Sequence, residues 1–175
     1  QAIVGYKKAR TELSGAISVK WQPIDRLGMS LTLREEMFGT DWSPIIPAFF
    51  IDGILWPRIN LTAKASVSRN FRFPSLNDLY FQPGGNPDLK KESGWTYDAG
   101  LTFKMGREEL YELSGGITWF DSYVKDWIIW LPTTKGFFSP KNIKDVHAYG
   151  VELNANTTFY WAKHWSLSLN GTFSW

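Results

Sequence analysis

Two groups of polar and aromatic side chains are the first candidates for chemistry in this chain. One group lies between residues 72 and 82, and the other lies between residues 135 and 138. Both fall in segments that we expect to be long loops, and exposed tips that mix aromatic rings with polar groups suit a bulky solute. We therefore expect ligand contacts from seven side chains: Arg72, Asn77, Tyr80, Gln82, Lys135, Phe137 and Phe138.

The sequence offers no arrangement typical of catalysis or of a metal site. His147 and His164 are far apart, and neither has a partner at the spacing of a catalytic triad or a metal site, so we interpret both as rim residues. Cysteine is absent, which excludes disulfide scaffolds, thiolate metal sites and cysteine nucleophiles. We expect a binding protein that is not an enzyme and that has no cofactor and no metal.

Composition alone would fit a soluble domain, with 43% hydrophobic, 17% aromatic and 21% charged residues. A transmembrane β-barrel also has moderate hydropathy, because only every second residue of a strand faces lipid, while aromatic residues gather in its interfacial girdles. Ten Trp, twelve Phe and seven Tyr fit that class. The net charge is +2 and basic residues are scattered among acidic ones, so nucleic acid is not an expected partner.

Alternation of apolar and polar residues is the main structural signal, and it is clearest from residue 149 to residue 161. A tilted strand crosses a bilayer with about 9 to 11 residues, a length that these runs approach or exceed. The alternation predicts strands at Leu13–Trp21, Leu27–Leu33, Ile59–Val67, Trp95–Phe103, Leu113–Leu131, Tyr149–Trp161 and Trp165–Trp175.

Three further assignments depend on weaker signals. In the strand Leu113–Leu131, Asp121 and Lys125 fall on the apolar face, which predicts either a bulge near Asp121 or exit from the membrane there. Ile45–Leu55 is assigned as a strand only because the connections must alternate. With a short strand at Ala2–Lys8, the count reaches about eight or nine antiparallel strands.

The expected connections alternate between short and long, as in outer-membrane barrels. Short turns are expected at Pro23–Arg26, Trp56–Arg58, Lys104–Glu109 and Ala162–His164, and long loops at Gly39–Pro44, Asn70–Gly94 and Pro132–Val146. Tryptophans near these ends are expected at the level of the lipid headgroups: Trp21, Trp161 and Trp165 at short turns, and Trp127 and Trp130 near a long loop. The fold class that follows is all-β, an arc of a large transmembrane β-barrel.

The segment Ser68–Tyr80 reads SRNFRFPSLNDLY, and the loop Gly85–Leu89 reads GNPDL, with Glu92 beginning the next strand. From the residues alone, this is a strand end followed by a turn. In order and identity it resembles the signature of TonB-dependent outer-membrane receptors, and the resemblance extends from Ile59 to Trp175. The matching motif positions are Arg69, Phe71, Arg72, Pro74, Ser75, Leu76, Asn77, Leu79, Tyr80, Gly85, Asn86, Pro87, Leu89 and Glu92.

The resemblance implies a task and a location. Residues 1–175 would be part of the barrel domain of a receptor with 22 strands in the outer membrane of a Gram-negative bacterium, with the plug domain and the TonB box outside these residues. Outer loops would capture a small-molecule nutrient such as an iron chelate or cobalamin, and TonB would drive its uptake. Outer-membrane lipid, the plug domain and TonB are the implied partners.

Two other classes of protein remain open from the sequence. A complete small outer-membrane barrel with a structural or surface role would explain the length of the chain. A soluble carbohydrate-binding β-sandwich would explain the aromatic residues and turns, but it requires two packed sheets of short strands. If the arc exists in isolation, its unpaired strand edges predict self-association, pairing with another chain or enclosure in a parent structure.

Overall fold

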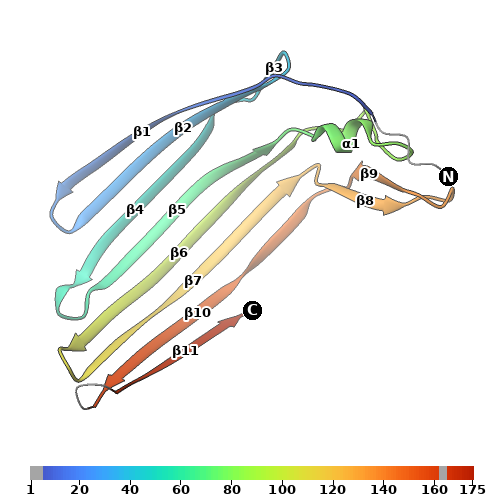
Figure 1. Cartoon of the computed structure of the whole chain (residues 1–175). Coiled ribbons are helices and arrows are strands. Elements are labelled where there is room, and N and C mark those ends of the chain that lie inside the picture. The colour runs from blue at the N-terminus through green and yellow to red at the C-terminus, as the bar shows by residue number, and fades with distance from the viewer. Residues whose placement is uncertain (1–5, 162–164) are drawn as a thin grey trace.

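The computed structural model describes residues 6–161 and 165–175 and contains one curved antiparallel sheet (Figure 1). The strand order is β1-β2-β4-β5-β6-β7-β10-β11, and β3 pairs with β2, so neighbours along the chain are mostly neighbours in the sheet. The strands are β1 Glu12–Ile24, β2 Leu27–Phe38, β3 Asp41–Trp42, β4 Ile46–Trp56, β5 Leu61–Arg72, β6 Glu92–Arg107, β7 Tyr111–Lys125, β10 Val146–Tyr160 and β11 Ser166–Ser174. The predicted all-β arc is confirmed.

The two ends of the sheet differ in their connections. At the short-turn end, strands are joined by residues 25–26, by the 3-10 turn η1 (Pro57–Ile59) and by residues 108–110. At the long-loop end lie β3, the helix α1 (Leu76–Tyr80), and the hairpin formed by β8 (Ile128–Pro132) and β9 (Phe138–Asn142) (Figure 1). This alternation agrees with the prediction.

The register separates apolar from polar side chains on the two faces of the sheet. Apolar residues lie opposite one another across several strands, as in the row Leu101, Ile117, Leu153 and Phe173. On the polar face, hydroxyl and carboxylate groups pair across strands, and Ser66 Oγ donates to Asp98 Oδ2 at 2.9 Å. The apolar face is uncovered in the described chain, since Ile17 keeps 73% of its surface exposed.

Buried side chains gather at the long-loop end, at the ends of sheet strands and in the segments beyond them. The hydrophobic ones are Ile46, Phe73 and Ile128, and Pro140 is fully buried. Buried polar residues lie at the same end: Ser43, Asp78 and Glu92. The described residues therefore form one large sheet with the two-stranded sheet β8–β9 and a small packed cluster at one end, unlike a sandwich, in which two sheets enclose a core. None of the helices in the described ranges has the length and hydropathy needed to cross a membrane.

The predicted strand Leu113–Leu131 is wrong in its extent. β7 ends at Lys125, and its register with β6 and β10 has no shift, so no bulge lies near Asp121. The continuous register puts Asp121 on the apolar side, where His147 Nε2 lies 3.1 Å from both of its carboxylate oxygens. Asp126, with a φ of 54°, then turns the chain away from the sheet into β8.

Other differences concern the ends and the loops. Residues 6–8 of the expected strand Ala2–Lys8 are not in a strand, and residues 2–5 lie outside the described residues. The turn Ala162–His164 lies outside them as well. The loops expected at Asn70–Gly94 and Pro132–Val146 contain α1 and β9. The Ser75 cap organises α1 locally, and Asn86 joins the first loop to β9.

Close approach of two strands at Gly94 gives a testable prediction. A Cβ at Gly94 would lie 2.9 Å from the Cα of Val124 and closer still to the carbonyl oxygen of Tyr123. We expect Gly94→Ala to reduce the free energy of unfolding by about 1–3 kcal/mol, the usual cost of overpacking. Gly171→Ala is the matched control, since a Cβ there meets nothing within 4 Å. Denaturant unfolding that leaves the two variants equal would contradict the assigned register.

Candidate functional site

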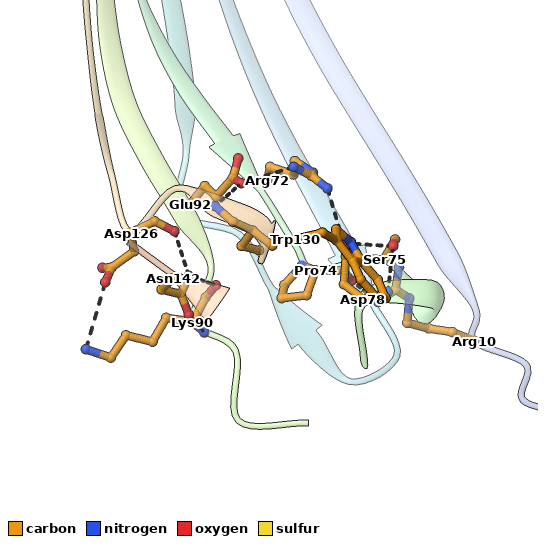
Figure 2. Close-up of polar contacts among 11 residues, drawn as sticks. Arg10, Arg72, Pro74, Ser75, Asp78, Lys90, Glu92, Asp126, Trp130 and Asn142 are labelled. Carbon is orange, nitrogen blue, oxygen red and sulfur yellow. Dashed lines mark hydrogen bonds and ion pairs between the residues drawn. The ribbon is translucent and has the colours of Figure 1, made fainter. Parts of the chain in front are cut away.

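The site is built around Arg72, the last residue of β5, at the long-loop end. Arg72 lies opposite Glu92, the first residue of β6, on the polar face. Its Nη1 contacts Glu92 Oε1 at 3.0 Å, and its Nη2 contacts Asp78 Oδ2 at 3.2 Å. One guanidinium therefore joins the strands β5 and β6 of the sheet to helix α1 (Figure 2).

Helix α1 forms because the sequence supplies a complete N-terminal cap. Ser75 is extended, and its Oγ accepts a hydrogen bond from the backbone N–H of Asp78 at 3.1 Å. In return, Asp78 Oδ2 accepts from the Ser75 backbone N–H at 2.9 Å and from its hydroxyl at 2.8 Å. This capping box satisfies donors that would otherwise be unpaired at the helix start.

The same two carboxylates hold the hairpin β8–β9. Trp130 Nε1 donates to Asp78 Oδ1 at 3.0 Å, and the backbone N–H of Ile128 donates to Glu92 Oε1 at 2.8 Å. Asp78 and Glu92 are only 4% and 6% exposed, so both charges are compensated by these donors and by Arg72. We call Arg72, Ser75, Asp78, Glu92 and Trp130 the clamp (Figure 2).

Two opposing effects set the pKa of Asp78. Burial raises the pKa, because a charge loses solvation. Hydrogen bonds from Ser75 and Trp130, together with the positive charge of Arg72, outweigh burial and hold the pKa below its ordinary value of 3.8. The carboxylate is therefore ionised at neutral pH and accepts hydrogen bonds at both oxygens.

A second set of contacts joins the loop after α1 to the strand β9. Asn86 Nδ2 donates to the carbonyl of Pro140 at 3.1 Å. Asn142 Oδ1 accepts from the backbone N–H of Lys90 at 2.8 Å, and Asn142 Nδ2 donates to the Lys90 carbonyl at 3.1 Å. Gly84 is needed for this packing, because a Cβ there would collide with the carbonyl oxygen of Phe138.

The segment before β1 also reaches the clamp region. Arg10 Nη1 donates to the carbonyl of Pro74 at 2.9 Å, and its guanidinium lies 4.5 Å from the ring centre of Phe38. Phe38 stacks on Phe73, with ring centroids 4.4 Å apart. Arg10 thereby connects β1 and β2 to the turn that precedes α1.

The structure places the seven predicted ligand residues in two neighbouring loops and gives them different environments. Asn77 and Gln82 are exposed on and after α1, and Lys135 is exposed in the turn of the hairpin. Phe138, at the start of β9, is 58% exposed, and Phe137 is half-buried beside it.

The remaining two have contacts within the chain. Arg72 is held by the clamp, and the ring centre of Tyr80 lies 5.3 Å from Lys8 Nζ and 6.2 Å from that of Tyr6. Ligand contact by any of the seven remains a prediction.

Sequence reasoning missed several residues that organise the site. Asp78 could have been found from the spacing Ser75-x-x-Asp78, which is a capping box. Trp130 was expected at the level of the lipid headgroups, which stays a prediction; its bond to Asp78 was not foreseen. The contacts of Asn142 with Lys90 and of Arg10 with Pro74 leave no local signal, because these residues are 52 and 64 positions apart.

The other motif positions mostly shape the backbone. Pro74 is buried, the Arg69 guanidinium donates to the carbonyl of Ile45 at 3.4 Å, and Asn86 Oδ1 accepts from the backbone of Asp88 at 3.1 Å. Over residues 6–161 and 165–175, no group of three or more His, Cys, Asp or Glu side chains could hold a metal ion.

Comparison with known proteins now identifies the class. A family model described as "TonB dependent receptor-like, beta-barrel" matches residues 3–175. The chain belongs to this family. The match covers β1 to β11 and both loops of the site, so it includes β1, β2 and β4, for which the sequence motifs gave no support.

Two curated relatives are similar over part of the chain. Both are described as "Vitamin B12 transporter BtuB": one from Photobacterium profundum is 34% identical over 104 residues, and one from Vibrio vulnificus is 33% identical over 92 residues. These matches cover 55% and 52% of this chain, but only 16% and 14% of the relatives.

Among solved structures, a chain described as "Copper transporter OprC" matches with a TM-score of 0.72 at 16% identity, covering 95% of this chain and 28% of that one. At this identity the likeness shows the fold alone. The relatives and the solved structure are named as transporters, which agrees with the class expected from the sequence motifs.

Removal of the Asp78 charge tests the clamp. We expect Asp78→Asn to reduce the free energy of unfolding by about 1–3 kcal/mol, because the half-buried Ser75 and Trp130 donors lose their ionised acceptor. Asp88→Asn, at an exposed position of the following loop, is the control and should change stability by less than about 0.5 kcal/mol. Equal losses in denaturant unfolding would argue against the clamp.

The lowered pKa of Asp78 also predicts a dependence on pH. The ionised carboxylate stabilises the folded loops at pH values above 3.8, and this stabilisation is lost as the pH falls through the still lower folded-state pKa. We expect hydrogen-exchange protection of α1 and β8 to fall between about pH 5 and about pH 2 relative to the sheet. In Asp78→Asn this pH dependence should be largely absent; an unchanged profile would show that another group titrates.

Proposed function

We propose that this chain is one arc of the barrel wall of a receptor in the outer membrane of a Gram-negative bacterium, where the intact receptor takes up a scarce, bulky nutrient by a TonB-dependent route. Membership of the TonB-dependent receptor family over residues 3–175 carries the proposal. The structure supports it with an uncovered apolar face, a polar face and organised loops at one end only.

The apolar face is the proposed lipid contact. The strands of the sheet other than β3 have 9 to 16 residues, which meets or exceeds the roughly 9–11 needed to cross a bilayer. Trp21, Trp161 and Trp165 are each more than half exposed at the short-turn end, where amphipathic rings suit the headgroup region. The polar face would then line the lumen, which a plug domain fills in the proposed receptor.

Adjacent residues of β7 allow a direct test of which face meets lipid. Ile117 lies on the apolar face and Thr118 on the polar face. We expect Ile117→Lys to reduce the free energy of unfolding in bilayers by about 2–4 kcal/mol, as for a lysine near the membrane midplane. Thr118→Lys should cost less than about 1 kcal/mol because its ammonium stays in water. Reversed losses would place lipid on the other face.

The proposed ligand belongs to the class of cobalamin or an iron chelate. The named activity of the two partly matching relatives favours testing cobalamin first. The plug domain and TonB are the proposed partners of the intact receptor, and the long-loop end is the proposed outer side, where the solute is captured.

The experiment that tests the proposal uses the full-length gene in a bacterium that lacks its own vitamin B12 receptor. Growth on limiting cyanocobalamin, present with TonB and absent without it, would support the proposed function. Growth independent of TonB would contradict the coupling. Failure of cyanocobalamin and of a panel of ferric chelates to support TonB-dependent growth or to bind would contradict the ligand class.

Candidate ligand residues are tested by affinity for whichever of these solutes supports growth. We expect Phe138→Ala to weaken binding about tenfold, equivalent to about 1.4 kcal/mol, because a bulky solute would cover this exposed ring. Lys104→Ala, exposed at the short-turn end, is the control and should bind normally. Unchanged equilibrium binding in Phe138→Ala would remove this residue from the site.

A further inference from the structure

The loop between β5 and β6 and the loop between β7 and β10 are packed into one body. We call residues 73–91 and 126–143 the plate. Its two halves come from distant parts of the sequence, yet each holds buried side chains at the long-loop end: Phe73 and Asp78 in one half, Ile128 and Pro140 in the other. Phe81 and Trp130, one from each half, contact edge to face with ring centroids 5.7 Å apart.

Four hydrogen bonds cross between the two halves of the plate, and a fifth joins the hairpin β8–β9 to the first residue of β6. Trp130 donates to Asp78 at 3.0 Å, Ile128 donates to Glu92 at 2.8 Å, and Asn86 donates to Pro140 at 3.1 Å. Asn142 makes the other two with the backbone of Lys90, at 2.8 and 3.1 Å. Four of the five involve a backbone group, so they constrain the backbone of both loops as well as the side chains.

Arg72 connects this body to the barrel wall. It is the last residue of β5, and its two contacts reach Asp78 of the plate and Glu92 at the start of β6. Figure 2 shows its guanidinium directed toward both carboxylates. Asp78 accepts hydrogen bonds from Ser75 and Trp130, and Glu92 accepts one from Ile128. Both carboxylates thus pair with Arg72, whose backbone belongs to the sheet.

We infer that the two loops move as a single rigid plate, with Arg72 as the positioning residue that attaches the plate to the wall. The role of the plate in ligand capture rests on the proposed function. In that function, the plate holds the candidate residues Asn77, Tyr80 and Phe138 at fixed separations before the ligand arrives. The solute meets a preformed surface, and neither loop opens without the other.

Distances between spin labels test the inference without any ligand. These 175 residues contain no cysteine, so Asn77→Cys and Lys141→Cys, both exposed, place one label on each half. In the full-length protein in lipid, we expect a single narrow distance distribution. Trp130→Phe combined with Asn142→Ala removes three of the five bonds and should at least double its width. Asp121→Asn, which alters the contact with His147 on the sheet, is the control and should leave it narrow.

A second pair of labels separates rigidity from attachment. With Asn77→Cys and Glu112→Cys, the latter at the short-turn end of β7, we expect Arg72→Met to broaden the plate-to-wall distance while the distance between the loops stays narrow. Arg72→Lys, which keeps the charge, should broaden it less. The sheet signal in circular dichroism checks that each variant is folded.

The inference is overturned by a broad or two-peaked distance between the loops in the unaltered protein, or by an Arg72→Met variant that leaves the plate-to-wall distance unchanged. Because these distances are measured without solute, absence of cyanocobalamin binding would contradict the proposed ligand and leave the rigid plate standing. Conversely, cyanocobalamin binding with independently mobile loops would support the uptake function and refute the plate.

Discussion

Backbone hydrogen bonding between neighbouring strands is the constraint on which the rest of this structure depends. Each interior strand pairs along its length with both neighbours, so its N–H and C=O groups are satisfied within the sheet. In lipid no water can replace these bonds, so a sheet crosses a membrane only when every strand is paired. β1 and β11 each have one partner in the described sheet. A complete wall therefore requires further strands beside them, as expected for an arc of a larger barrel.

Pairing on this scale leaves the sheet without a core of its own. Both faces of a single layer are open, and the apolar one must be covered by lipid in order to be favourable. In the described residues, the buried hydrophobic side chains lie at the long-loop end, at Ile46, Phe73, Ile128 and Pro140. The clamp can use buried charges there because Arg72, Ser75 and Trp130 supply donors for both carboxylates.

The sequence was informative where the structural period is short and regular. Strands such as β10 and β11 follow from alternation alone, since one apolar face and one polar face on a strand produce a period of two. The family motif was also visible, but its physical role was not. The helix α1 is only five residues long, and what forms it is a cap rather than a periodic pattern. Its cap residue Ser75 was read as part of a turn.

The bulge near Asp121, one of the two explanations predicted for the charges on this strand, failed for a different reason. It depended on the assumption that charge cannot occupy the apolar face of a paired strand, whereas the extent to Leu131 is wrong because Asp126 turns the chain out of the sheet. Beyond Trp119 the otherwise apolar face of β7 carries a charged residue, Asp121, and His147 on the neighbouring strand β10 provides its partner. Contacts between residues separated by 26 positions leave no mark on local alternation. The same holds for the bonds between Asn142 and Lys90, which are separated by 52 residues.

The clamp also bears on which candidate residues a solute can reach. For Arg72 to turn toward a ligand, Asp78 and Glu92 would lose their shared cation while remaining buried. Separation of a fully buried pair costs about 3–5 kcal/mol, and the cost here is smaller because the Arg72 side chain is 50% exposed. A ligand would have to offset that cost before gaining any affinity. Asn77, Gln82, Lys135 and Phe138 face no such penalty, since each is exposed. Recognition by these four requires no rearrangement of the plate, which makes them stronger candidates than the arginine that holds it in place.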